Sequence, residues 1–293
     1  MSSTQSAVAL HSPRSRLSRS RLGNHIGRAI AAIILAAFIC FFAVPLAWLI
    51  EASTKTSYQL QTEAPFALGN WAALAASWNQ LMGFEGGAFI GWLGNSALYS
   101  VSALVVMLIA SIPAGYALAL TRFRLRKPLL VVTLVVMLMP NTALVLPTFL
   151  ELNAVGLIGN PLSVILPFSF FPFGVYLTVI YFSTSVPRDL LSAARIDGCS
   201  ELQVFLRIAL PLALPIVALI GFFSFVQSWT NYFLPFVMLP SSNVYPIQVG
   251  LAQLGRFAPA LAVLIAALPV GVLFVVFQRF LISGRTAGAL ASE

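Results

Sequence analysis

The chain has 293 residues, of which 59% are hydrophobic and only 8% are charged. A soluble domain of this length carries roughly 25% charged residues, so the composition excludes that class. The apolar runs are continuous, which disfavours a membrane β-barrel, whose strands alternate apolar and polar residues. The two cysteines, Cys40 and Cys199, have no metal-binding spacing. We therefore expect an all-α polytopic membrane protein without a metal site.

Six apolar runs are long enough to cross the ~30 Å of a bilayer, which takes about 20 residues. We expect a disordered, basic cytoplasmic tail at 1–27, a six-span domain at 28–283 and a cytoplasmic tail at 284–293. The first run is longer than the apolar part of a signal peptide and lacks a cleavage site, so it is expected to be retained. Prolines in or beside the runs predict bent helices that line a cavity. The expected spans are 29–50, 90–120, 128–150, 162–183, 212–239 and 257–281.

The basic residues are distributed unevenly between the two expected sides. Fourteen of the 16 Lys and Arg residues fall before 29, in 121–127, in 184–211 or after 278, and only Lys55 and Arg256 fall elsewhere. Because Lys and Arg favour the cytoplasmic side, both termini and the segment 184–211 are expected there. The net charge of +8 is then a topology signal, and no nucleic-acid partner is needed to explain it.

The expected spans contain amides and hydroxyls but no ionisable side chain in their interiors. This disfavours a proton-driven pump, which needs a relay of such groups. Hydrolase and phosphate-loop motifs are also absent, so we expect no catalytic residue and no cofactor, with energy supplied by a partner. Gln227 and Asn231 are four residues apart and share a helix face. With Asn141 they are candidates for a translocation path, although hydrogen bonding between helices would also explain them.

The segment PRDLLSAARIDGCSELQVFLRIALP, residues 187–211, is charged and lies between apolar runs. Pro187 suits a first helical position, and Gly198 suits the left-handed residue that ends a helix. Ser200 and Gln203 form a capping box that starts a second helix. The segment is either a surface helix packed on its own bundle or a docking helix, at about 187–198, for a cytoplasmic partner. The candidate docking residues are Leu190, Ala193, Ala194, Arg195, Asp197 and Gly198.

This segment resembles the EAA motif of membrane subunits of binding-protein-dependent ABC importers, E-A-A-x-x-D-G followed by I-x-L-P. Ser192 replaces the motif's Glu and Cys199 its common Ala. Asn95-Ser96, Trp229-Thr230-Asn231 and the tail 284–290 look like the MalG-like branch, which imports carbohydrates. The positions that match the motif are Ala193, Ala194, Asp197, Gly198, Ile208, Leu210 and Pro211.

The resemblance implies a type I importer permease (MetI-like) fold in a bacterial-type inner membrane. It also implies a second, similar permease, two ATPase subunits that drive transport through the docking helix, and an extracellular solute-binding protein. The implied cargo is a sugar, either a disaccharide or an oligosaccharide.

Two other functions remain as alternatives. One is ABC import of a different solute such as glycerol phosphate, which would need an Arg near the pathway; the interiors of the second to fifth expected spans have none. The other is a self-sufficient carrier or channel, which the docking-helix motif disfavours.

Overall fold

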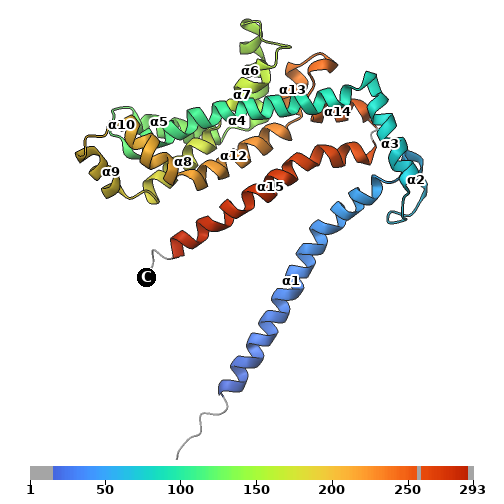
Figure 1. Ribbon diagram of the computed structural model, residues 1–293, viewed down its shortest axis with the longest axis horizontal. Coiled ribbons are helices and arrows are strands. Elements are labelled where there is room, and N and C mark those ends of the chain that lie inside the picture. The colour runs from blue at the N-terminus through green and yellow to red at the C-terminus, as the bar shows by residue number, and fades with distance from the viewer. Residues whose placement is uncertain (1–15, 256–258, 290–293) are drawn as a thin grey trace, which may run out of the picture.

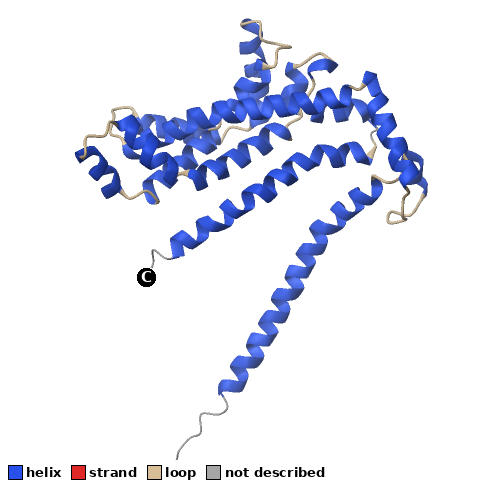
Figure 2. Cartoon of the chain, viewed as in Figure 1, coloured by secondary structure: helices blue, strands red, loops and turns tan. Residues whose placement is uncertain are grey.

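The computed structural model describes residues 16–255 and 259–289, and within these ranges the chain forms helices joined by short connections, without strands (Figures 1 and 2). The longer helices are α1 (Arg16–Ala52), α3 (Trp71–Gly83), α4 (Ala88–Leu120), α5 (Arg126–Met137), α6 (Asn141–Ala154), α8 (Pro172–Thr184), α12 (Leu214–Trp229) and α15 (Ala260–Ala289). The shorter ones are α2 (Ser57–Thr62), η2 (Phe84–Gly86), α7 (Leu162–Ser169), α9 (Arg188–Ile196), α10 (Glu201–Val204), η3 (Phe205–Ala209), α11 (Leu210–Leu212), α13 (Phe233–Met238), η4 (Ser242–Val244) and α14 (Ile247–Leu254).

Helix α4 is the central element, and α7, α8 and α12 pack against it. A close approach makes the α4–α8 contact possible: a Cβ at Gly115 would lie 2.5 Å from Cβ of Thr178. Small residues at such contacts let helix backbones come together in membranes. Nearer the start of α4, the Ser100 and Ser228 hydroxyls are 3.2 Å apart and join α4 to α12.

Hydrogen bonds at both ends of α4 hold loops that lie at opposite ends of the bundle (Figure 1). Near its start, the Trp92 indole N–H donates to the Ser242 carbonyl at 3.0 Å. Near its end, the Tyr116 hydroxyl donates to the Glu201 carboxylate, also at 3.0 Å. At 1.5 Å per residue, the 24 positions between Trp92 and Tyr116 span about 36 Å, which exceeds the ~30 Å of bilayer hydrocarbon. The two loops are therefore far enough apart to lie on opposite sides of a membrane.

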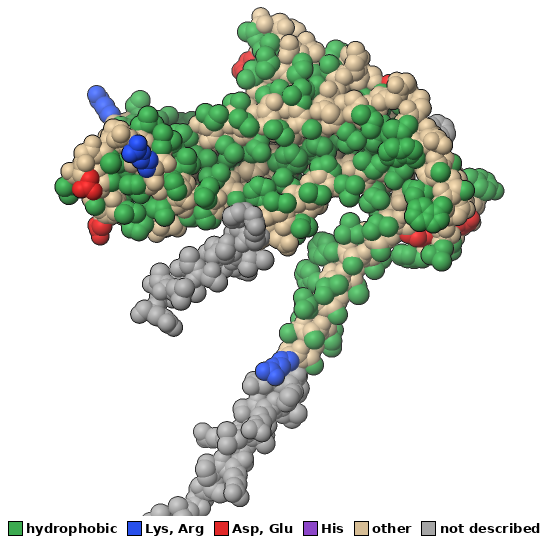
Figure 3. Space-filling model, viewed as in Figure 1, with side chains coloured by type: hydrophobic (Ala, Val, Ile, Leu, Met, Phe, Trp, Pro, Cys, Tyr) green, Lys and Arg blue, Asp and Glu red, His purple; other side chains and the backbone are tan. Residues whose placement is uncertain are grey.

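Helix α1 lies away from this core along most of its length (Figure 1), whereas the first half of α15 packs against α12. The apolar window of α1 contains no buried residue, and large side chains such as Phe41 and Ile33 are exposed. Figure 3 shows apolar side chains covering the bundle and α1, while charged groups gather toward the ends. An apolar surface of this extent is stable in lipid or against another protein.

The expected tail boundaries differ from the structure. Helix α1 begins at Arg16, so residues 16–27 are helical, whereas a disordered tail was expected there. Adding residues to an existing helix needs no new nucleus, and Arg and Leu are good helix formers. At the other end, α15 continues to Ala289 and includes part of the expected C-terminal tail. The rest of the two tails, 1–15 and 290–293, lies outside the described residues.

One of the six expected spans is sharply bent, and another has a sharp bend at its start. Four described segments are long and apolar enough to cross a membrane, and two bent pairs would raise the number to six. In the expected span 128–150, α5 and α6 meet at 108° across Leu138–Pro140. In the expected span 212–239, the helical segment 201–212 meets α12 at 76°, and α12 ends at Trp229. Proline lacks an N–H and disfavours helix at the residue before it, which accounts for the break at Pro140.

Candidate functional site

The segment 187–212 forms a helical hairpin, which we call the α9–α10 hairpin. Helix α9 begins at Arg188, one residue later than expected, because Pro187 is its extended N-cap. Gly198 has φ +84°, so it is the left-handed residue at the turn. The capping box is present: the Ser200 hydroxyl accepts from the Gln203 backbone N–H at 3.3 Å, and the Gln203 side-chain oxygen Oε1 accepts from the Ser200 backbone N–H at 2.8 Å.

Helix α9 has a buried face and an exposed face. Leu191 and Ala194 are 1% and 8% exposed and belong to the core formed with α4, α8 and η3. On the other face, Ile196 is 85% exposed and Leu190 is 46% exposed, and Ala193 lies beside them. The structure thus separates Ala193 from Ala194, which were both expected to face a partner. The helix packs on its own bundle and still presents an apolar surface.

Arg195 joins the two helices of the hairpin instead of projecting freely. Its guanidinium donates twice to the Glu201 carboxylate, at 2.6 and 3.3 Å, and the Tyr116 hydroxyl donates to the same carboxylate. The hydrogen bond from Arg195 lowers the pKa of Glu201 below its ordinary value and raises the pKa of Arg195. A two-point contact of this kind fixes orientation as well as distance. It holds α9 against α10 and against the end of α4.

A cavity of about 790 Å³ lies where three helical segments are interrupted. The breaks fall between α5 and α6, between α7 and α8, and between α12 and α13, and residues from all six helices line the cavity. At membrane depth, non-helical backbone is tolerated where it is buried in protein or lines a water-filled space. The volume of this cavity falls within the ~300–1,000 Å³ that is usual for small-molecule binding sites.

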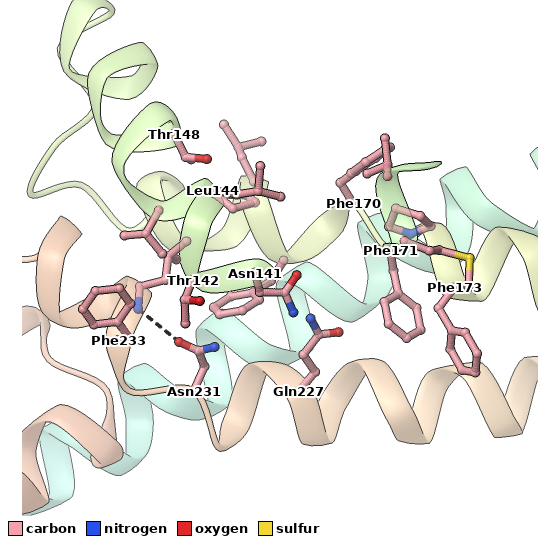
Figure 4. A pocket seen from close by; sticks show the side chains of 18 of the residues that line it. Asn141, Thr142, Leu144, Thr148, Phe170, Phe171, Phe173, Gln227, Asn231 and Phe233 are labelled. Carbon is pink, nitrogen blue, oxygen red and sulfur yellow. Dashed lines mark hydrogen bonds between the residues drawn. The ribbon is translucent and has the colours of Figure 1, made fainter. Parts of the chain in front are cut away.

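The three amides expected to form a translocation path all line this cavity (Figure 4). Asn141 is the first residue of α6, and its side chain points toward that of Gln227 on α12. Asn231 lies just beyond α12, where its side-chain oxygen Oδ1 accepts from the Leu234 backbone N–H at 3.1 Å. The amides of Asn141 and Gln227 have no partner in the described part of the chain, so they are free to bind a solute.

Two features of the cavity lining were not predicted from the sequence. Glu151, which follows the expected span 128–150, lies within α6 and lines the cavity together with Thr148. The spacing of Asn141, Thr148 and Glu151 matches one helix face, but this is visible only once α6 is known to begin after Pro140. The second feature is a set of phenylalanines in the lining, namely Phe168, Phe170, Phe171, Phe173, Phe223 and Phe233.

Other polar residues singled out in the sequence are structural. The Asn95 amide donates to the carbonyls of Asn243 and Tyr245 at 2.8 and 3.0 Å. The Ser96 hydroxyl accepts from the Ile247 backbone at 2.7 Å. The Trp229 indole donates to the Ala266 carbonyl at 3.0 Å and so joins α12 to α15. These side chains hold loops and helices together, away from the cavity.

Comparisons with known proteins agree on a family. Residues 111–286 match the family described as binding-protein-dependent transport system inner membrane component. The arabinooligosaccharides transport system permease protein AraQ of Halalkalibacterium halodurans is 33% identical over 261 residues, covering 87% of this chain and 93% of that protein. The sulfoquinovosyl glycerol transport system permease protein SmoH of Agrobacterium fabrum is 32% identical over 271 residues, covering 90% and 93%.

A solved structure shows the same fold. It is the crystal structure of a bacterial ABC transporter involved in the import of the acidic polysaccharide alginate, and one of its chains superposes with a TM-score of 0.76 at 22% identity. The match covers 88% of this chain and 97% of that chain. The expected all-α permease fold is thereby confirmed, while the number of spans stays a prediction. The chain therefore belongs to the family of inner-membrane components of binding-protein-dependent transport systems, the non-catalytic, multi-pass permease subunits of ABC importers.

Proposed function

We propose that the chain is one of two homologous permease subunits of an importer that moves a disaccharide or oligosaccharide into the cell. Two copies of an ATPase dock on the cytoplasmic side, and an extracellular binding protein delivers the sugar on the other. Both termini and the α9–α10 hairpin are cytoplasmic in this proposal, as the distribution of Lys and Arg indicates.

The exposed face of α9 is the observation that carries the proposal. Leu190, Ala193 and Ile196 form an apolar strip on a helix whose other face is fixed to the core. Charged groups surround the strip, and Gly198 and Asp197 end it with a tight turn. A partner that seats on this strip would move α9, α10 and α4 together, since Arg195 and Tyr116 both bind Glu201. Rigid-body motion of this kind is one route to alternating access.

Two observations support a sugar as the cargo. The relatives named above are permeases for arabinooligosaccharides and sulfoquinovosyl glycerol. The cavity joins amide and hydroxyl side chains to an aromatic wall, and such a lining suits a ligand with hydroxyl edges and apolar faces. No Arg lines the cavity in the described residues, which disfavours glycerol phosphate.

Co-purification tests the proposal. The tagged chain, expressed with the genes beside its own, is expected to bring down a second permease and an ATPase whose hydrolysis rises with binding protein and sugar. Ile196→Glu puts a charge into the apolar strip, so it should lose the ATPase or its stimulation. The matched control is Leu125→Glu, at an exposed leucine between α4 and α5. A chain that purifies alone and moves a solute in liposomes without ATP would overturn the proposal.

A further inference from the structure

Glu151 is an acidic residue in the lining of the cavity. It lies in the last turn of α6, four residues after Pro147, and its side chain is exposed at the cavity. No hydrogen bond or ion pair engages its carboxylate anywhere in the described part of the chain. The C-terminal end of a helix carries a partial negative charge, so an acid there is unfavourable. The carboxylate is therefore slightly unfavourable for the helix and is accessible to a ligand in the cavity.

Among the lining residues, Glu151 alone determines the net charge of the cavity. The other polar side chains around the cavity are neutral, and they are Asn141, Thr142, Thr148, Gln227 and Asn231. Neither Lys, Arg nor His lines the cavity among the residues that the structure describes. Most of the wall is apolar, which weakens dielectric screening relative to open water. The cavity thus carries one uncompensated negative charge.

We infer that Glu151 determines substrate charge in this subunit: the cavity accepts neutral saccharides and rejects saccharides that carry carboxylates. The carboxylate accepts hydrogen bonds from sugar hydroxyls, which are stronger than those to a neutral acceptor. A uronate in the same place would face a like charge with no cation to offset it. The inference rests on the proposed function, because it names the class of sugar that the same cavity takes.

The test uses the co-purified transporter without its binding protein, so that only the membrane subunits select. Saturation-transfer NMR would compare arabinotriose with trigalacturonate, a neutral and an acidic trisaccharide of matched length. The wild type is expected to favour arabinotriose by at least about tenfold, the effect of one like-charge contact in a partly screened site. Glu151→Gln should bring the ratio close to one, and Glu151→Arg should reverse it. Glu63→Gln, which removes an exposed acid far along the chain from α6, should leave the ratio unchanged.

The outcomes separate this inference from the proposed function. A wild-type ratio near one, binding of neither sugar, or an unchanged ratio in Glu151→Gln would each overturn the role of Glu151. None of these would affect ATP-driven sugar uptake by the complete transporter, which tests the proposed function independently. Loss of uptake for every sugar, with the charge ratio intact, would overturn the proposed function alone.

Discussion

At the scale of single residues, Lys55 shows how a charge can be structural in this protein. It follows α1 and is 2% exposed. Its ammonium pairs with Glu51 at 2.9 Å and donates to the carbonyls of Ala64 and Pro65 at 3.1 and 3.3 Å. It thus closes the loop between α2 and α3 over the end of α1. Because all three partners lie within residues 51–65, the contact stabilises only the end of α1 and the loop that follows α2.

Lys55→Met is expected to lower the free energy of unfolding by about 3 kcal/mol, since it leaves the Glu51 carboxylate buried without a counter-ion. Neither oxygen of that carboxylate accepts another hydrogen bond in the described residues. Thermal unfolding of the purified protein, followed by tryptophan fluorescence, measures the change. Adding Glu51→Gln should recover part of the loss. A double variant no more stable than Lys55→Met would show that the pair does not stabilise the loop.

At the scale of elements, the α9–α10 hairpin depends on the contacts of Glu201. Glu201→Ala removes the acceptor of both Arg195 and Tyr116, so α9 is expected to open more often. The pair is largely exposed, and its contribution is therefore at most about 1 kcal/mol. Hydrogen exchange of residues 188–200 should rise several-fold while exchange in α4 stays unchanged. Exchange equal to the wild type would contradict this function of Glu201.

The same contact has a defined pH dependence. The pKa of Glu201 is lowered in the folded protein. A carboxylate of this kind contributes stability that is fully present above its ordinary pKa of 4.5 and is lost as the pH falls through the lowered value. The hairpin should therefore keep its protection from exchange at neutral and mildly acidic pH. The exchange experiment repeated from neutral pH to below pH 4.5 provides the check, because protection should fall only in the acidic part, and Glu201→Gln is the variant that does not respond.

How far an element could be predicted from the sequence depends on how local its causes are. The capping box at Ser200 and the left-handed Gly198 were predictable because each is set by residues within a few positions. The angle between α5 and α6 was not, since a proline permits a break but tertiary packing sets its size. The contacts of Arg195 could not be predicted either, because they also depend on tertiary packing. Through Glu201, Arg195 is joined to Tyr116, which lies 79 positions away in the sequence.

At the scale of the whole molecule, α4 separates two regions that labelling can assign to opposite sides of the membrane. Ser192 is exposed on α9, and Ser241 is exposed next to η4. In a cysteine-free background, Ser192→Cys is expected to react with an impermeant maleimide only from the cytoplasmic side, and Ser241→Cys only from outside. Labelling of both from one side would contradict the proposed topology. Reaction of each after membrane solubilisation is the control for accessibility.

The membrane class and most span positions could be predicted because they follow from composition and run length alone. The candidate cavity could be predicted only in part. Asn141, Gln227 and Asn231 were singled out by polarity, whereas Glu151 and the aromatic wall required the three helix breaks to be placed in space. The departure of α1 from the bundle could also not be predicted, because the sequence of an apolar helix is the same kind of sequence whether lipid or protein covers the helix.

The contacts of the α9–α10 hairpin also determine when it can form during synthesis. Tyr116, Arg195, Glu201 and the buried core around Ala209 have all been made by residue 220. Helix α15 begins only at Ala260. Because the hairpin contacts are short-range or reach back to chain already made, they can close on the ribosome within microseconds of emergence. The surface proposed for the ATPase is therefore complete before the last membrane helix exists, and assembly can begin on a nascent chain.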